Sequence, residues 1–142
     1  MKLIAERIIA YLKNDSTLTT LLGSSKNIFA ENLQEPENRK TKYVVIPVEP
    51  GEDLNYASGQ QGSFVIEVCV SRTIAGAFGV CLNIADRVDA LLNKGEAGLS
   101  TTGWKVVHIK RTGSPSHGPL VDKEAGEVYI DLEYEYLLDE SA

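Results

Sequence analysis

Val128-Tyr129-Ile130-Asp131-Leu132-Glu133-Tyr134-Glu135-Tyr136 is the stretch that decides the fold. Apolar side chains at every second position alternate with Tyr129 and three carboxylates. An extended strand with this alternation has one apolar face and one acidic face. The stretch therefore predicts a long, half-buried strand near the end of the chain.

Four other segments have the composition of strands. Residues 103–111 form one, in which Trp104, Val106 and His108 are expected to share a face, with His108 partly buried. Residues 42–48 are rich in β-formers, and Pro47 favours a sheet edge or a strand end. A short strand is expected over 26–30. Residues 63–71 alternate one apolar set with a more polar one, namely Phe64, Ile66, Val68 and Val70 against Val65, Glu67, Cys69 and Ser71.

Helical periodicity marks three further segments. Residues 2–13 repeat apolar side chains at helical spacing, and a short helical turn follows, with Asp15 or Ser16 as its N-cap and Gly23 as its C-cap. A long helix is expected over about 74–93, with one apolar stripe made of Ile74, Phe78, Cys81, Leu82, Ala85, Val88 and Leu92. The sequence thus predicts one α+β domain over residues 1–142. Its mostly antiparallel sheet of about four to five strands carries an N-terminal helix and one long helix.

Composition limits the possible partners. The 142 residues suffice for one self-supporting core, and the formal net charge of −6 argues against ordinary nucleic-acid binding, which needs Lys and Arg for the phosphates. Cys69 and Cys81 lie in apolar surroundings, which suits a reducing compartment. Neither a signal-peptide core nor a membrane span is recognisable. We expect a soluble protein made in the cytoplasm, with no membrane partner.

Residues that could support catalysis are few. Ser116, His117 and Asp122 lie close together in sequence, but the Gly-x-Ser-x-Gly elbow of a hydrolase nucleophile is absent, and a Gly/Ser/Pro loop is the expected structure. The cysteines and histidines lack zinc-ligand spacing, and no Gly-rich phosphate loop occurs. No enzymatic activity, catalytic residue, metal or cofactor is predicted.

The carboxylates Asp131, Glu133 and Glu135 are candidates for a functional surface. Their alternation points them to one side of the strand, with neighbours about 7 Å apart. One interpretation is a solvated sheet face, and the other is an acidic surface that lines something which must not adhere.

Two long polar segments, 32–42 and 50–62, exceed the usual loop length of a compact domain and are expected to order on assembly. Their neighbourhood has charges of both signs, which could pair between subunits at under about 1 kcal/mol each. The interface candidates are Arg39, Lys40, Lys42, Glu49, Glu52 and Asp53.

A family resemblance rests on the order and spacing of segments over most of the chain. Val65-Ile66-Glu67-Val68 leads through Ser71-Arg72-Thr73 into the long helix, which contains Ile84-Ala85-Asp86-Arg87-Val88 and Leu91-Leu92. After the helix come Gly103-Trp104, Val107, Ile109, Arg111, Leu120, Asp122, Gly126 and Asp131-Leu132-Glu133-Tyr134. This pattern resembles the tail terminator proteins of long-tailed phages and prophages, also called tail-completion or minor tail proteins.

The resemblance implies a structural virion-assembly protein that forms a homohexameric ring. The ring would cap the tail tube, join it to a head-connector protein and let DNA pass without specific binding. The protein would be in the host cytoplasm during assembly, where it could be a monomer before the ring forms, and then in the virion tail. The long segment 113–126 departs from the family pattern and leaves a head-closure or other neck component as an alternative. A small α+β ligand-binding or regulatory module, with a pocket around Trp104, His108 and Tyr134, is another.

Overall fold

The computed structural model describes residues 2–30, 41–46, 61–100, 105–112 and 119–139. Within these ranges the helices and strands follow one another without an internal repeat. In chain order they are α1 (Lys2–Lys13), α2 (Ser16–Leu22), the 3-10 helix η1 (Ser25–Asn27), β1 (Ile28–Ala30), β2 (Lys42–Ile46), β3 (Gln61–Ser71), α3 (Ala77–Leu92), α4 (Glu96–Leu99), β4 (Lys105–Thr112), β5 (Leu120–Asp122) and β6 (Glu127–Asp139).

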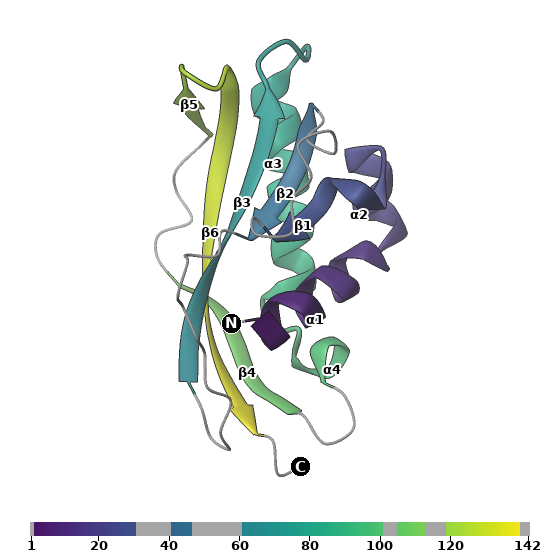
Figure 1. Ribbon diagram of the computed structural model, residues 1–142, viewed down its shortest axis with the longest axis vertical. Coiled ribbons are helices and arrows are strands. Elements are labelled where there is room, and N and C mark those ends of the chain that lie inside the picture. The colour runs from purple at the N-terminus through teal and green to yellow at the C-terminus, as the bar shows by residue number, and fades with distance from the viewer. Residues whose placement is uncertain (1, 31–40, 47–60, 101–104, 113–118, 140–142) are drawn as a thin grey trace.

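The molecule has two layers, a sheet and the helices that cover one of its faces (Figure 1). The sheet has six strands in the order β1-β2-β3-β6-β4, with β5 also paired to β6. Every pairing is antiparallel except that of β1 with β2. The predicted α+β class is confirmed, and the sheet exceeds the predicted four to five strands because the three-residue β5 also joins it.

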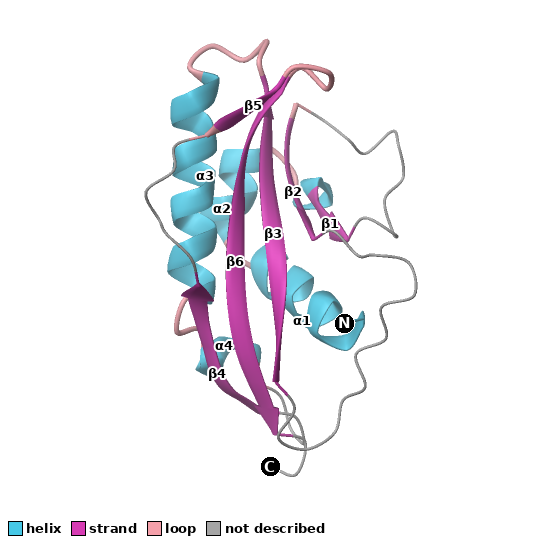
Figure 2. Ribbon diagram, turned by 90° about the vertical axis from the view of Figure 1, so that its left-hand side faces the viewer, coloured by secondary structure: helices cyan, strands magenta, loops and turns pink. Residues whose placement is uncertain are grey.

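The long strands β3 and β6 form the centre of the sheet (Figure 2). They pair from Gln61 opposite Leu137 to Ser71 opposite Glu127. The predicted apolar face of β6 is buried against the helices, with Tyr134 fully enclosed. The Tyr134 ring stacks on Phe64 at a centroid distance of 5.4 Å, and its hydroxyl donates to Asp89 of α3 at 2.8 Å. The alternation in the sequence therefore predicted both the strand and its inward face.

The start of α2 links two helices through a single carboxylate. Asp15 is the N-cap, and its Oδ2 accepts a hydrogen bond from the Leu18 amide at 2.8 Å. The same carboxylate binds the guanidinium of Arg87 on α3, with Nη2 to Oδ1 at 2.6 Å. Gly23 ends α2 in the left-handed conformation at φ 87°, as predicted.

We expect Asp15→Ala to lower the free energy of unfolding by about 2 kcal/mol, because it removes the cap and the ion pair together. Asp15→Asn keeps a capping oxygen and should cost about half as much. The hydrogen bond from Arg87 lowers the pKa of Asp15 below 3.8, so this stabilisation should be lost as the pH falls through that lowered value. Urea unfolding across acidic pH measures both effects. Thr17→Ala, an exposed change in the same helix, should be nearly neutral.

The long helix α3 differs from its prediction in two respects. It begins at Ala77 rather than near residue 74, because Gly76 has a left-handed backbone at φ 69° and ends the preceding turn. Phe78 and Leu82 were expected in the apolar stripe, yet they are 49% and 41% exposed, while Ile84 is fully buried. The N-cap of α2, Asp15, binds Arg87 of α3, so α2 lies on the flank of α3 that carries Arg87 and Ile84. The buried stripe is therefore rotated away from Phe78 and Leu82.

Because of a β-bulge in β4, the His108 side chain lies on the opposite face of the sheet from the one predicted. Val106 pairs with Leu138 and His108 with Leu137, so Val107 is an extra residue. Val106 and Ile109 are consequently both buried under the helices. The prediction that His108 shares a face with Val106 was therefore wrong, and the third residue of that prediction, Trp104, lies outside the described residues.

Both cysteines are free and buried. Burial raises the pKa of the Cys81 thiol to about 12, and burial followed by the charge of Glu67 raises the pKa of Cys69. Both side chains therefore behave as small apolar groups at neutral pH. Within the described ranges, no helix has the length and apolar character needed to cross a membrane.

Candidate functional site

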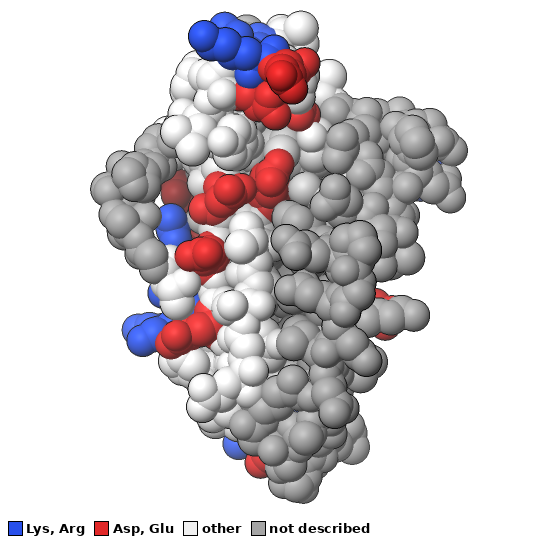
Figure 3. All heavy atoms as spheres, turned by 60° about the vertical axis from the view of Figure 1, so that its left-hand side comes forward, with Lys and Arg blue, Asp and Glu red and all other residues white. Residues whose placement is uncertain are grey.

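The sheet face without helices carries a column of carboxylates. β6 contributes Asp131, Glu133 and Glu135 to it, and β3 contributes Glu67 directly opposite Asp131. Figure 3 shows acidic side chains following one another along this face. We call Glu67, Asp131, Glu133 and Glu135 the acidic column. All three carboxylates predicted from the sequence lie on it, and Glu67 is an addition.

The middle of the acidic column concentrates negative charge. Asp131 and Glu133 are both exposed, and neither forms an ion pair with a Lys or Arg among the described residues. Partial desolvation, and then the charge of Glu133, raises the pKa of Asp131 above 3.8, while a hydrogen bond with Glu67 opposes the rise. This part of the sheet is therefore a repulsive surface for other anions.

Glu135, at one end of the acidic column, is locally neutralised. Its Oε1 lies 3.3 Å from Nε2 of His108 and 3.4 Å from Nζ of Lys110. The hydrogen bond with His108, and then the interactions with Lys110, lower the pKa of Glu135 below 4.5. The bulge at Val107 is what brings His108 to this face. Glu135 thus contributes less to the negative field than Asp131 and Glu133 do.

An apolar cluster borders the other end of the acidic column. Phe29, Tyr43, Val45 and Cys69 are buried there, with Tyr129 packed against them. Phe29 and Tyr43 stack at 5.7 Å, and the Tyr43 hydroxyl donates to Glu127 at 2.9 Å. The helix-free face is therefore not uniformly polar, since an apolar cluster lies on it beside the carboxylates.

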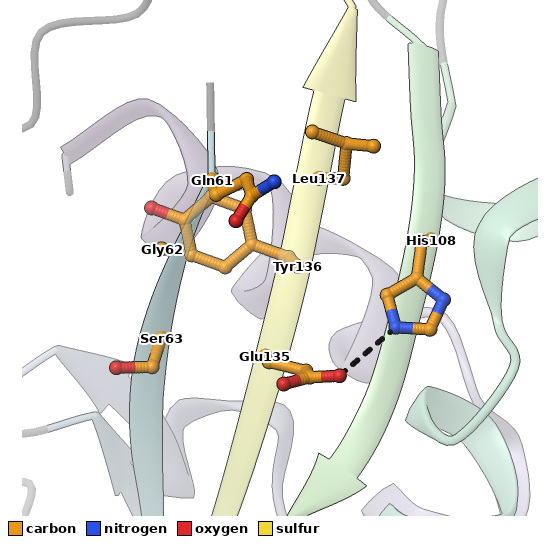
Figure 4. A pocket seen from close by; sticks show the side chains of 7 residues that line it. All are labelled: Gln61, Gly62, Ser63, His108, Glu135, Tyr136 and Leu137. Atoms are coloured by element: carbon orange, nitrogen blue, oxygen red, sulfur yellow. Dashed lines mark hydrogen bonds and ion pairs between the residues drawn. The ribbon is translucent and has the colours of Figure 1, made fainter. Parts of the chain in front are cut away.

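A hollow of about 430 Å³ opens beside Glu135. Figure 4 shows Ser63 on β3 and His108 on β4, with the Glu135 carboxylate of β6 between them. A hydrolytic triad needs the imidazole between the nucleophile and the carboxylate, so this order cannot activate Ser63 through His108. The hollow is lined by Gln61, Gly62, Ser63, His108, Glu135, Tyr136 and Leu137.

The pocket predicted around Trp104, His108 and Tyr134 is not assembled as expected. Tyr134 points into the helical layer, whereas His108 lies on the opposite sheet face. Of the residues considered for hydrolysis, Ser116 and His117 lie outside the described ranges. Asp122 is described, and it accepts hydrogen bonds from the amides of two turn residues, Glu124 and Ala125.

Most of the predicted interface residues lie outside the described residues. Lys42 is the first residue of β2. The predicted ordering of the two long polar segments also concerns residues that are mostly outside the described ranges. The interface candidates outside those ranges are Arg39, Lys40, Glu49, Glu52 and Asp53.

Glu67 is the site residue that the sequence reasoning did not select. The sequence did indicate its position, because Glu67 belongs to the more polar set of side chains in the alternation over residues 63–71. What the alternation could not supply was the register, which sets Glu67 opposite Asp131 rather than one pair further along.

We expect Asp131→Asn to raise the free energy of unfolding at neutral pH by about 0.5 kcal/mol, a small effect because the side chain is exposed. The raised pKa means that the folded state binds more protons than the unfolded state between 3.8 and that raised value. The extra free energy of unfolding of Asp131→Asn, relative to the native chain, should therefore grow as the pH rises through this window. Glu135→Gln is the matched control with the opposite sign, because the pKa of Glu135 is lowered. Urea titrations between acidic and neutral pH give both differences.

Gly62 allows the Tyr136 ring to pass close to β3. A Cβ at position 62 would overlap the hydroxyl end of that buried ring. Gly62→Ala should therefore lower the free energy of unfolding by about 2 kcal/mol. Ser63→Ala, at the next and exposed position, is the control and should change it little. Thermal unfolding followed by circular dichroism would measure the stability of both variants. Equal stabilities of the two variants would contradict the packing of Tyr136 against Gly62.

Comparison with known proteins gives a structural likeness only. No protein-family model matches the sequence, and no curated protein matches it significantly. The structure is similar to a chain of a solved structure described as the virion of a native gene transfer agent particle. The TM-score is 0.67 at 19% sequence identity, over 93% of this chain and 91% of that chain. At this identity the likeness establishes a shared fold.

Proposed function

We propose that the chain is a structural subunit of a phage-like particle, a tail terminator that caps the tail tube as a homohexameric ring. The observation that carries the proposal is the acidic column, which lies on the sheet face that none of the described helices covers. The shared fold with a chain of a gene transfer agent virion supports a role of this kind.

In such a ring the acidic column faces the central channel. Double-stranded DNA carries one negative charge per about 1.7 Å of axis, so a channel lined by Asp131 and Glu133 repels it and lets it pass without adhering. The helical layer faces outward. The partners are other copies of the chain, the tail-tube protein and a head-connector protein. The protein assembles in the host cytoplasm and ends in the virion tail.

The role is structural rather than enzymatic, and the whole chain acts as one domain. In the hollow, the Glu135 carboxylate lies between Ser63 and His108, whereas a catalytic triad needs the imidazole in that middle position. The described part of the chain also contains no group of three His, Cys, Asp or Glu side chains that could hold a metal ion.

Deletion of the coding sequence in a particle-producing host tests this function. We expect filled heads and separate tails in micrographs, and joined particles again when the chain is supplied from a plasmid. Intact, infectious particles after deletion would contradict the proposal. Labelling of rescued particles would separate a tail terminator, at the tail end of the joint, from a head-closure component on the head side.

The hollow beside Glu135 favours a second candidate, a small ligand-binding module. Its polar lining by Gln61, Ser63, His108 and Glu135 would suit a small polar molecule. A thermal-shift screen of polar metabolites tests this candidate. A saturable shift that Ser63→Ala and His108→Ala both remove would support it, and the absence of any shift would leave the structural role unchallenged.

A further inference from the structure

Among the described strands at the edges of the sheet, β4 is the long one, and a separate segment covers it. β4 has eight residues, whereas β1 and β5 have three each. A long edge strand offers a row of backbone amides and carbonyls to any other strand, and a very short one offers few. The segment 93–100, which contains α4, lies against β4 (Figure 2). We call residues 93–100 the edge cover.

The edge cover binds the backbone of β4 through four hydrogen bonds. Three amides of β4 donate to side-chain oxygens of the cover at 3.0 to 3.3 Å, namely Val106 to Ser100 Oγ, Ile109 to Glu96 Oε1 and Arg111 to Asn93 Oδ1. The fourth bond runs the other way, from the Lys94 amide to the Ile109 carbonyl at 3.0 Å. The cover therefore occupies backbone groups that point away from β6 and that a neighbouring strand would otherwise use.

Contacts with α1 hold the edge cover in place. The guanidinium of Arg7 donates to the carbonyl of Leu99 at 2.9 Å and to that of Gly98 at 3.1 Å. The Tyr11 ring lies so close to Gly98 that a Cβ there would overlap it. The Leu99 side chain is buried in the core. The cover is therefore a fixed part of the fold.

A strained turn brings the chain from α3 onto β4. Lys94 has a φ of 62°, and it is the one non-glycine residue with a positive φ in the described part of the chain. Such a backbone is unfavourable for a residue with a side chain and persists only where the surrounding structure holds it. The strain lies where the Lys94 amide reaches the Ile109 carbonyl, which supports a role for this contact beyond chain connection.

We propose that the edge cover is an autoinhibitory contact, which prevents β4 from pairing with β4 of a second copy of the chain. Two identical strands that pair antiparallel are related by a two-fold axis, so an uncovered β4 would be complementary to itself in every copy. The partner that the cover excludes is therefore a second copy, and the pairing would extend one sheet across two chains. This inference goes beyond the proposed function and does not depend on it.

The charges of β4 oppose such pairing only weakly. Lys110 lies 3.4 Å from Glu135, and Arg111 lies 3.4 Å from Asp89. Lys105 is the first residue of the strand, so the two copies of Lys105 would lie at opposite ends of an antiparallel pair. The hydrogen bonds of the cover, rather than repulsion between charges, are therefore what keeps the edge closed.

Sedimentation velocity across a concentration series tests the edge cover, with the full chain throughout. Asn93→Ala, Glu96→Ala and Ser100→Ala together remove the three side-chain acceptors. This triple variant should form a species of about twice the mass of the native one or more, whatever the state of the native chain, and the species should dissociate on dilution. Adding Arg111→Pro should restore the native mass, because the Arg111 amide faces the cover and proline has no N–H to offer a second copy.

Hydrogen exchange, followed by nuclear magnetic resonance, separates strand pairing from a loss of fold. In the dilute triple variant, the amides of Val106, Ile109 and Arg111 should exchange at least about tenfold faster than in the native chain. They should regain protection at high concentration, when a second copy pairs with them. The amides that join β3 and β6 should keep their native rates at every concentration. If the triple variant does not fold, Glu96→Ala alone frees the Ile109 amide and should give the same changes at that residue.

The matched control removes the same kinds of side chain from exposed positions on the helices. Glu6→Ala, Thr17→Ala and Asn83→Ala together should leave the mass and the exchange rates unchanged, and so should Glu96→Gln, which keeps the acceptor oxygen. Edge amides that exchange fast at every concentration in a variant of native mass would overturn the inference. So would self-association that Arg111→Pro does not reverse or that the control shares. Each comparison is with the mass of the native chain, so none of these results bears on the proposed ring.

Discussion

Tyr134→Ala is expected to lower the free energy of unfolding by about 4 kcal/mol, enough to leave a large unfolded fraction in a domain of ordinary stability. Tyr134 is fully buried and stacks on Phe64 at 5.4 Å. Its loss leaves a cavity at the centre of the sheet, between β3 and α3. It also removes the hydroxyl that donates to Asp89. Urea unfolding, followed by far-ultraviolet circular dichroism, measures the change.

Tyr134→Phe separates the two contributions. The ring remains, and only the 2.8 Å hydrogen bond to Asp89 is lost, so the expected cost is about 1 kcal/mol. Asp89 keeps its contact with Arg111 at 3.4 Å. If the two variants were equally unstable, the hydrogen bond rather than the packing would hold this part of the core. A cost below about 1 kcal/mol for alanine would contradict the core described here.

Reversing the charge of Asp131 and Glu133 should convert a surface that repels DNA into one that retains it. Asp131→Lys with Glu133→Lys changes the net charge of each chain from −6 to −2 and places all of the change on the acidic column. Because new lysines can neutralise phosphates, the assembled variant should retain duplex DNA at about 50 mM salt and release most of it by about 200 mM. Fluorescence anisotropy with labelled DNA provides the measurement, and the native chain should give no signal.

The control for this experiment carries the same net change on the helical side. Glu6→Lys on α1 and Asp86→Lys on α3 are both exposed positions, so this variant also has a net charge of −2. It should not retain DNA at the same salt concentrations. Equal retention by the two variants would mean that net charge, rather than the acidic column, governs the behaviour. In particles, only the Asp131 and Glu133 variant should lose infectivity.

Local sequence signals predicted the elements that depend on neighbours in the chain. The alternation along β6 gave its two faces, and the residues around α2 gave its N-cap Asp15 and its left-handed C-cap Gly23. Such signals act over a few residues and do not depend on the rest of the fold. The predicted α+β class followed from their order.

The errors arose where long-range packing decides. An extra residue at Val107 exchanges the faces of β4, and no local pattern distinguished it from ordinary alternation. Phe78 and Leu82 fit a helical stripe, but the position of α2 determined which flank of α3 is covered. The acidic column was predicted in part, because Glu67 joins it only through the pairing of β3 with β6.

The absolute mass of the purified chain, measured by light scattering across a concentration series together with electron micrographs, tests the central claim most directly. One chain has a mass of 15.5 kDa. The proposed function predicts a species about six times heavier, seen as a closed ring with a central opening. A mass of one chain at every concentration, with no ring in the micrographs even after tail-tube protein is added, would contradict it.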